Sequence, residues 1–128
     1  MATGGAGGGW SKSPVELVAA LGEALDRFPD AARRQMFGYP AALANGNMWT
    51  GLFQTRWVIR LPDPDRAELL GMEGAIPFEP MPGREMRGYA VLPPSVVDDP
   101  TRLHAWLERA WTAALAMPPK EAGARKKR

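Results

Sequence analysis

An Asn-Gly pair at positions 45 and 46 separates two apolar, β-prone runs of the chain. The favoured two-residue hairpin turn requires positive φ at both central residues, and Asn-Gly is the pair that meets this requirement most readily. The sequence therefore predicts a β-hairpin that starts the sheet, with strands near residues 34–44 and 47–54. Pro40 lies inside the first strand, which it would interrupt or confine to a sheet edge.

Strand alternation predicts which side chains of the hairpin share a face. In the second strand it places Trp49 and Phe53 on one face and Met48 and Leu52 on the other. Three more segments have strand character: 57–61, 74–79 and 84–92. The first of them follows a turn at residues 54–55. The chain is thus expected to form five short strands.

Three segments predict helices from the spacing of their apolar residues and from their first residues. The first helix is expected over residues 14–28, with Ser13 as N-cap, Pro14 at the first helical position and Glu16 completing a capping box. An Asp-Pro pair opens each of the other two, with Asp63 capping a short helix that ends at Gly71 and Asp99 capping the longest one. One face of the longest helix carries Leu103, Trp106, Leu107, Ala110, Ala114 and Met117, and Pro118-Pro119 end it.

The predicted order is helix, three strands, helix, two strands, helix. This order is typical of a two-layer α+β domain, in which helices pack on an antiparallel sheet. The 128 residues provide one core, so we expect one domain over residues 13–119. A Gly-rich leader (1–12) and a charged tail (120–128) have little to bury and are expected to be flexible and disordered, respectively.

Composition excludes several kinds of chemistry. The chain has no cysteine and one histidine, His104, so disulfides, thiolate metal sites, cysteine nucleophiles and multi-histidine metal sites are excluded. We identify no catalytic residues, no metal ligands and no cofactor site. No apolar run is long enough to span a bilayer and no signal peptide is recognisable, so we expect a cytoplasmic protein without a membrane partner.

The positive charge of the chain is concentrated at its C-terminal end. The net charge is +2, yet residues 1–119 hold 11 basic and 13 acidic side chains. A basic arm can contact nucleic acid weakly through phosphates, although plain solvation explains it almost as well. The possible polyanion contacts are Lys120, Arg125, Lys126, Lys127 and Arg128.

Several short motifs, in this order and spacing, give the chain a family resemblance. They are Met36-Phe37-Gly38, the strand at 57–61, Pro77-Phe78, the segment 86–93 centred on Tyr89, and Trp106 ahead of Arg109-Ala110. Over residues 13–117 the chain resembles the TfoX N-terminal domain family. The resemblance implies a compact, secretion-chaperone-like α+β domain, and its namesake is a regulator of natural competence. Tyr39-Pro40 stands where many members continue with glycine, which is expected of a stand-alone subgroup.

Methionine and aromatic side chains adapt to apolar surfaces, so a group of such residues, together with one arginine, suggests a possible partner or ligand surface. Its members are Met36, Phe37, Tyr39, Trp49, Trp57, Arg84 and Tyr89. The alternative is that the aromatic members pack in the core. A stacking platform for bases is disfavoured, because such platforms come with a positively charged groove.

Two hypotheses for function follow. The first is a non-enzymatic protein-binding or regulatory module that acts through its sheet edge or an apolar groove, with an unknown protein partner and a monomer slightly favoured over a homodimer. The second is a small-molecule binder or enzyme with a pocket between sheet and helices, using Arg84, Glu85 or Tyr89. Convergent polar groups with shifted pKa values would favour the second, and an apolar patch the first.

Overall fold

The computed structural model describes residues 12–36 and 38–119 of the chain. Expectations about the leader before Lys12, about Phe37 and about the basic tail lie outside the described residues. The elements in chain order are α1 (Val15–Leu25), β2 (Ala32–Met36), β3 (Tyr39–Ala44), β4 (Asn47–Phe53), β5 (Arg56–Arg60), α2 (Asp63–Leu70), β6 (Ile76–Pro77), β7 (Tyr89–Val91), α3 (Pro94–Val97) and α4 (Pro100–Ala116).

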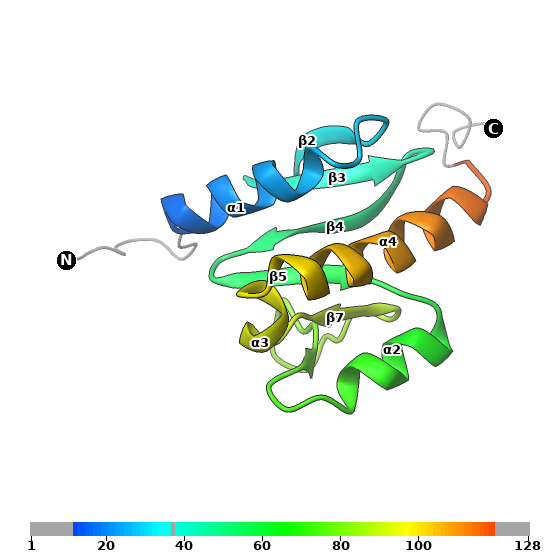
Figure 1. The fold of residues 1–128 in the computed structure, drawn as a ribbon. Helices are drawn as coiled ribbons and strands as arrows, with labels where there is room; N and C mark the ends of the chain where they lie inside the picture. The colour runs from blue at the N-terminus through cyan, green and yellow to red at the C-terminus, as the bar shows by residue number, and fades with distance from the viewer. Residues whose placement is uncertain (1–11, 37, 120–128) are drawn as a thin grey trace.

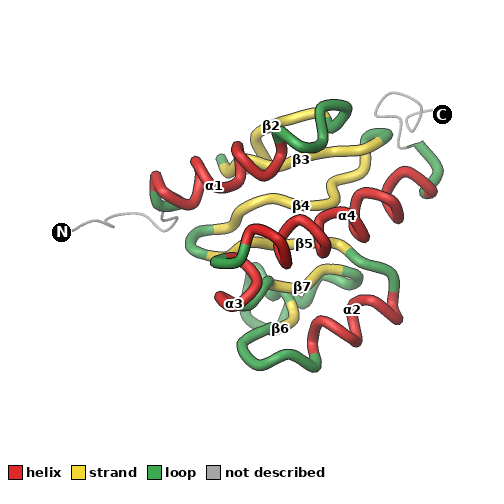
Figure 2. The backbone as a smooth tube through the Cα atoms, viewed as in Figure 1, coloured by secondary structure: helices red, strands yellow, loops and turns green. Residues whose placement is uncertain are grey.

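The strands form one antiparallel sheet in the order β2-β3-β4-β5-β7-β6. Helices α1, α3 and α4 cover one face of this sheet, and α2 lies beside β7 (Figures 1 and 2). The predicted two-layer α+β arrangement is therefore confirmed.

The Asn-Gly hairpin forms as predicted, and it joins β3 to β4. Asn45 and Gly46 have φ values of 53° and 80°, as the tight hairpin turn requires. The single strand expected over 34–44 was wrong, because β2 and β3 form an earlier hairpin in which Met36 pairs with Tyr39. Pro40 accordingly lies in an interior strand, opposite Gln35, and not at a sheet edge.

A β-bulge in β4 overturns the predicted faces of that strand. Thr50 pairs with Ala42 and Met48 with Leu43, so Trp49 is an extra residue in the ladder. The alternation shifts by one residue there, and Trp49 and Leu52 both pack in the core under the helices. Met48 and Phe53 lie in the cluster on the other face.

Helix starts follow the predictions at one of three positions. Asp99 caps α4, and its side chain accepts hydrogen bonds from the backbone N–H groups of Thr101 and Arg102. Asp63 was wrongly expected to be a cap, because α2 already includes it and no side chain caps that helix. Ser13 does not cap α1 either, since its Oγ donates to the carbonyl oxygen of Gln54, 2.7 Å away.

The last part of the sheet is shorter than the sequence suggested. The strand expected over 84–92 is reduced to β7, because Gly88 adopts a φ of 85° and the residues before it lie in an exposed loop. Arg66 of α2 holds this loop: its Nε donates to the carbonyl oxygen of Tyr89 (2.8 Å) and its Nη2 pairs with Glu85 (2.6 Å). The short helix α3 was not predicted, so the expected element order was incomplete.

The sheet separates two apolar clusters. The larger one lies under the helices and includes Leu21 and Leu25 of α1, Trp49 and Trp57 of the sheet, and Leu107 of α4. The smaller one lies on the opposite face and consists of Tyr39, Phe53, Val58, Phe78, Tyr89 and Val91. Both faces of the central strands are therefore buried. Close packing on both faces makes β3, β4 and β5 rigid, and these strands support the edge strands.

Candidate partner-binding groove

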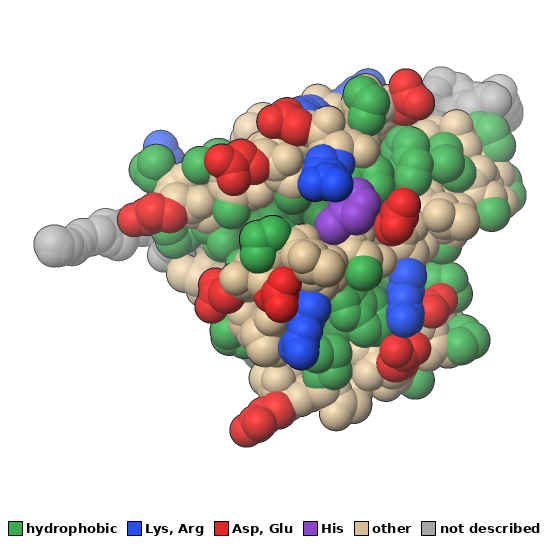
Figure 3. Space-filling view, viewed as in Figure 1, with side chains coloured by type: hydrophobic (Ala, Val, Ile, Leu, Met, Phe, Trp, Pro, Cys, Tyr) green, Lys and Arg blue, Asp and Glu red, His purple; other side chains and the backbone are tan. Residues whose placement is uncertain are grey.

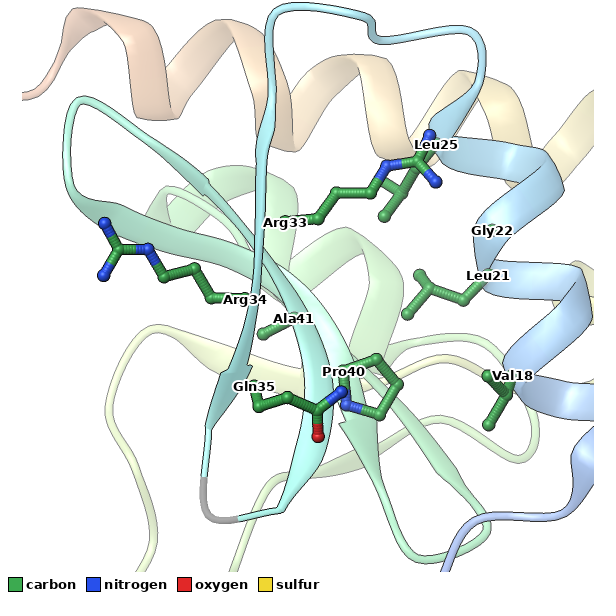
Figure 4. A pocket seen from close by; sticks show the side chains of 9 residues that line it. All are labelled: Val18, Leu21, Gly22, Leu25, Arg33, Arg34, Gln35, Pro40 and Ala41. Carbon is green, nitrogen blue, oxygen red and sulfur yellow. The ribbon is translucent and has the colours of Figure 1, made fainter.

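A groove of about 400 Å³ runs between α1 and the edge of the sheet (Figure 4). Apolar side chains form most of its lining, with polar ones contributed by β2. The lining residues are Val18, Leu21, Gly22, Leu25, Arg33, Arg34, Gln35, Pro40 and Ala41. We refer to these nine residues as the α1–β2 groove.

The groove exists because α1 packs on the middle of the sheet and leaves the outer strand uncovered. Helix α1 contacts β4 and α4, and its Leu21 and Leu25 are buried there. Val18, one turn before Leu21 and Gly22, is 40% exposed, and Val15 is 82% exposed. Apolar surface therefore continues from the groove along α1 toward its N-terminus.

Gly22 keeps the helix side of the groove open. A Cβ atom at this position would meet no atom within 4 Å, so neither packing nor a close backbone approach demands glycine. Glycine inside a helix is less stable than alanine by about 0.5–1 kcal/mol. The packing around Gly22 does not explain this lower helix stability. The need to keep space in the groove for an occupant explains it.

The strand side of the groove is an open sheet edge. All of β2 is exposed except for the half-buried Met36, and no described strand pairs with its outer side. The opposite edge strand, β6, has only two residues, and one is Pro77. Short strands and proline are the usual protection of an edge. Strand β2 has five residues and no proline.

Two arginines give β2 its charge. Arg33 points toward α1 in Figure 4, and its Nη2 lies 2.9 Å from Oδ1 of Asp26, at an exposed position where such a pair contributes little. Arg34 points to the other side of the sheet. No acidic residue lines the groove. The helix-covered face shown in Figure 3 differs, because basic, acidic and apolar side chains alternate across it.

Four aromatic residues suggested for a partner or ligand surface lie inside the molecule. Tyr39, Trp49, Trp57 and Tyr89 are all buried, which is the arrangement of the core-packing alternative. The indole of Trp57 donates from Nε1 to Oγ1 of Thr50 at 2.9 Å, and that hydroxyl donates to the carbonyl oxygen of Val58 at 2.8 Å. Met36 is the half-buried last residue of β2 and is not among the residues that line the groove.

The residues suggested for an enzymatic pocket do not converge. Arg84 is exposed, and Glu85 is engaged by Arg66. The hydroxyl of Tyr89 donates to the carbonyl oxygen of Met48 at 3.1 Å. Burial raises the pKa of Tyr89, although the Arg60 guanidinium above its ring partly offsets this. These contacts hold the sheet and the loop before β7 together.

His104 belongs to an aromatic cluster on α4. Its ring stacks on Phe28 with the centroids 5.3 Å apart, and its Nε2 lies 3.9 Å from Glu108. Within residues 12–36 and 38–119, no three histidine or carboxylate side chains gather as a metal site requires. No helix in the same part of the chain has the length and apolar character to cross a bilayer.

Reasoning from the sequence missed most of the groove. Val18, Leu21 and Leu25 form an apolar stripe at the spacing expected of the helix predicted over residues 14–28. Nothing in the sequence indicated that this stripe is wider than the surface it covers. The detectable signal was Gly22, an unexplained glycine within that stripe. Arg33 and Arg34 were not among the residues predicted for a site.

The model of the TfoX N-terminal domain matches residues 23–114 of the chain. The chain belongs to the TfoX N-terminal domain family. The match runs from the last turn of α1 into the last turn of α4, so it covers the whole sheet and the strand side of the groove. No curated protein and no solved structure matches the chain.

Proposed function

We propose that this TfoX N-terminal domain is a non-enzymatic protein-binding module with a regulatory role in the cytoplasm, and that its partner binds in the α1–β2 groove. The observation that carries the proposal is Gly22. It costs helix stability, no contact among the described residues requires it, and it borders the groove. Positions where a sequence departs from local stability without a packing reason are typical of functional surfaces.

The surroundings of Gly22 support the same conclusion. Val15 and Val18 expose apolar surface next to the groove, and β2 exposes a sheet edge on its other side. Exposed apolar surface beside unpaired strand edges is characteristic of protein-binding sites. The regulatory role is what the family's namesake, a regulator of natural competence, suggests.

Site-specific photo-crosslinking in the native host tests the proposal. A photoreactive residue at Gln35, on the rim of the groove, should crosslink to another protein, whereas one at Thr112, on the exposed side of α4, should not. Gly22→Leu fills the groove and should abolish the Gln35 crosslink. Ala19→Leu adds the same side chain on an exposed part of α1 outside the groove and should leave it unchanged. A crosslink that survives Gly22→Leu would contradict the proposal.

We also propose an auxiliary contact between nucleic acid and the basic residues 120–128. Its support is the cluster of five basic side chains and one acidic one in that segment. Fluorescence anisotropy of labelled DNA and RNA should show weak binding at low salt that vanishes as the salt concentration rises. Replacing the five basic residues by glutamine in the full chain should remove this binding. Binding that persists in the neutralised chain would place the contact on the folded domain.

A further inference from the structure

We propose that the partner presents an extended segment with alternating acidic and apolar residues, which pairs with β2 as an additional strand and places an apolar side chain in the α1–β2 groove. This inference rests on the proposed function and names the chemistry of the partner. Three independent features of the groove carry it: the backbone of β2, its charges and the shape of the apolar wall.

The register of the β2–β3 hairpin leaves hydrogen-bonding groups free at the edge. Gln35 pairs with Pro40, which has no N–H, so this is the kind of pair that exchanges no ladder bonds. Arg33, two residues earlier, has the same orientation. The N–H and C=O groups of Arg33 and Gln35 therefore face outward, while those of Arg34 belong to the ladder with Ala41. An added strand would bond to Arg33 and Gln35.

The charges of β2 select an acidic strand. Arg33 lies on the helix side of the sheet, where Asp26 already pairs with it, and Arg34 lies on the other side, so the acidic residues of an added strand belong on the face of Arg34. A second copy of this chain would place the arginines of two β2 strands against each other, and like charges in opposed positions are destabilising. Charge complementarity thus favours a carboxylate-bearing segment over a copy of the chain.

The apolar lining of the α1–β2 groove explains why the partner's segment should also contain apolar residues. Side chains of an added strand alternate between the two faces, so those on the helix side point into the space between α1 and β2. Val18, Gly22 and Pro40 border that space, and Gly22 leaves room where any other residue would place a side chain. An acidic residue next to an apolar one in the sequence fits this arrangement, because the apolar side chain then enters the groove and the acidic one lies on the opposite face, beside Arg34.

The probe is a fluorescent peptide, Ser-Glu-Val-Asp-Val-Glu-Ser with blocked ends, titrated with the full chain. We expect saturable binding, and at least tenfold weaker binding for the same peptide with lysine in place of Glu and Asp. Gly22→Leu should weaken binding at least fivefold and Ala19→Leu should not. Equal binding of the acidic and lysine peptides would overturn the proposal.

Hydrogen exchange of individual amides tests strand pairing directly. The peptide should slow exchange at Arg33 and Gln35 and leave Arg34 unchanged, because the Arg34 amide is already in the ladder. Gln35→Pro removes one outward donor and should weaken binding at least fivefold, whereas Gln35→Ala keeps that donor and should bind like the wild type. Peptide binding without protection of Arg33 and Gln35 would overturn strand addition even if Gln35→Pro fails to fold.

The two proposals fail in different ways. If the acidic peptide does not bind while the Gln35 photo-crosslink remains sensitive to Gly22→Leu, the groove binds a partner of other chemistry and only the present inference is wrong. If the crosslink is absent, the proposed function itself is wrong. Displacement of the peptide by a DNA oligonucleotide at physiological salt would show a nonspecific anion site and would also overturn strand addition.

Discussion

Gly22 occupies the middle of α1, where the helix would be more stable with almost any other residue. Because a Cβ atom there meets nothing, Gly22→Ala should raise the free energy of unfolding by about 0.5–1 kcal/mol. Urea unfolding followed by circular dichroism measures the change. Gly51→Ala is the contrasting variant, since its Cβ would lie 3.0 Å from both Ala41 and the Pro40 carbonyl oxygen, and it should destabilise the protein.

Thr50 is a buried polar side chain at the centre of the sheet, and its hydroxyl links β4 to β5. It accepts from Trp57 Nε1 and donates to the Val58 carbonyl oxygen. Thr50→Val keeps the shape but leaves a buried indole N–H without its partner, which should cost about 1–3 kcal/mol of stability. Thr50→Ser retains the hydroxyl and should lose less. Equal losses in chemical denaturation would contradict a role for the hydrogen bonds.

Residue-scale features differ in how far sequence can predict them. Asparagine and glycine adopt positive φ more readily than other residues, so the turn at Asn45 and Gly46 was predicted correctly from these two residues. Trp49 has no local sign that it is an extra residue in the ladder. The bulge arises because β4 has to pair with β3 and pack against the helices at the same time. Strict alternation of faces does not allow for the bulge, so it assigned the residues next to Trp49 to the wrong faces.

The starts of α2 and α4 have the same Asp-Pro sequence and different capping. Asp99→Ala should destabilise the protein by about 0.5–2 kcal/mol, because Asp99 accepts two backbone N–H bonds at the start of α4. Asp63→Ala should have a smaller effect, since the Asp63 side chain makes no cap bond. Thermal unfolding of both variants tests this, and equal losses would contradict the observed difference in capping.

Helices α2 and α4 are joined by an ion pair that predicts a pH dependence. Both oxygens of Glu68 accept from Arg109, at 2.9 and 3.2 Å, and this interaction lowers the pKa of Glu68. A lowered folded-state pKa means that the stabilisation is complete above the unfolded value of about 4.3 and is lost as pH falls through the folded-state pKa.

The matched variant is Glu68→Gln. It should be less stable than the wild type at pH 7, and the difference should shrink on acidification below pH 4. The site is exposed, so the effect should also weaken in high salt. Urea unfolding at several pH values measures it, and a difference that grows on acidification would contradict the pairing.

Elements were predictable where one strong local signal defines them. The long helix α4 combines a cap, an apolar stripe and a terminal Pro-Pro, and its bounds agree closely with the prediction. The β2–β3 hairpin was missed because the run 34–44 reads as one apolar strand, and the tight connection after Met36 has no Asn-Gly pair. The segment 84–88 alternates like a strand, yet the Arg66 contacts hold it as a loop.

At the scale of the whole molecule, the charges of the open edge predict a monomer. Pairing of two β2 strands would oppose Arg33 and Arg34 with their copies, so the chain should sediment as a monomer at micromolar concentration. Replacing both arginines by valine removes the repulsion and should produce concentration-dependent dimers or aggregates. Sedimentation velocity measures both. A wild-type dimer that tolerates the double substitution unchanged would contradict the role of the arginines.

The groove shows why a site can stay hidden when a fold is predictable. The fold follows from periodicity within single segments, whereas the groove depends on how far α1 lies from β2. That distance is set by contacts of α1 with β4 and α4, which are distant in sequence. The aromatic residues that suggested a surface were instead required by the core. Tryptophan and tyrosine provide the largest buried area of any side chains, and a domain of this size uses them for packing.

The order of elements along the chain has a consequence during synthesis on the ribosome. Strands β2 to β5 form a meander of neighbouring hairpins, so their contacts are local and this part can form early. The long helix that covers Trp49 and Trp57 is translated last of the described elements. Until α4 emerges, the nascent sheet presents an uncovered aromatic face, which is the kind of surface that chaperones bind and that aggregates in crowded cells.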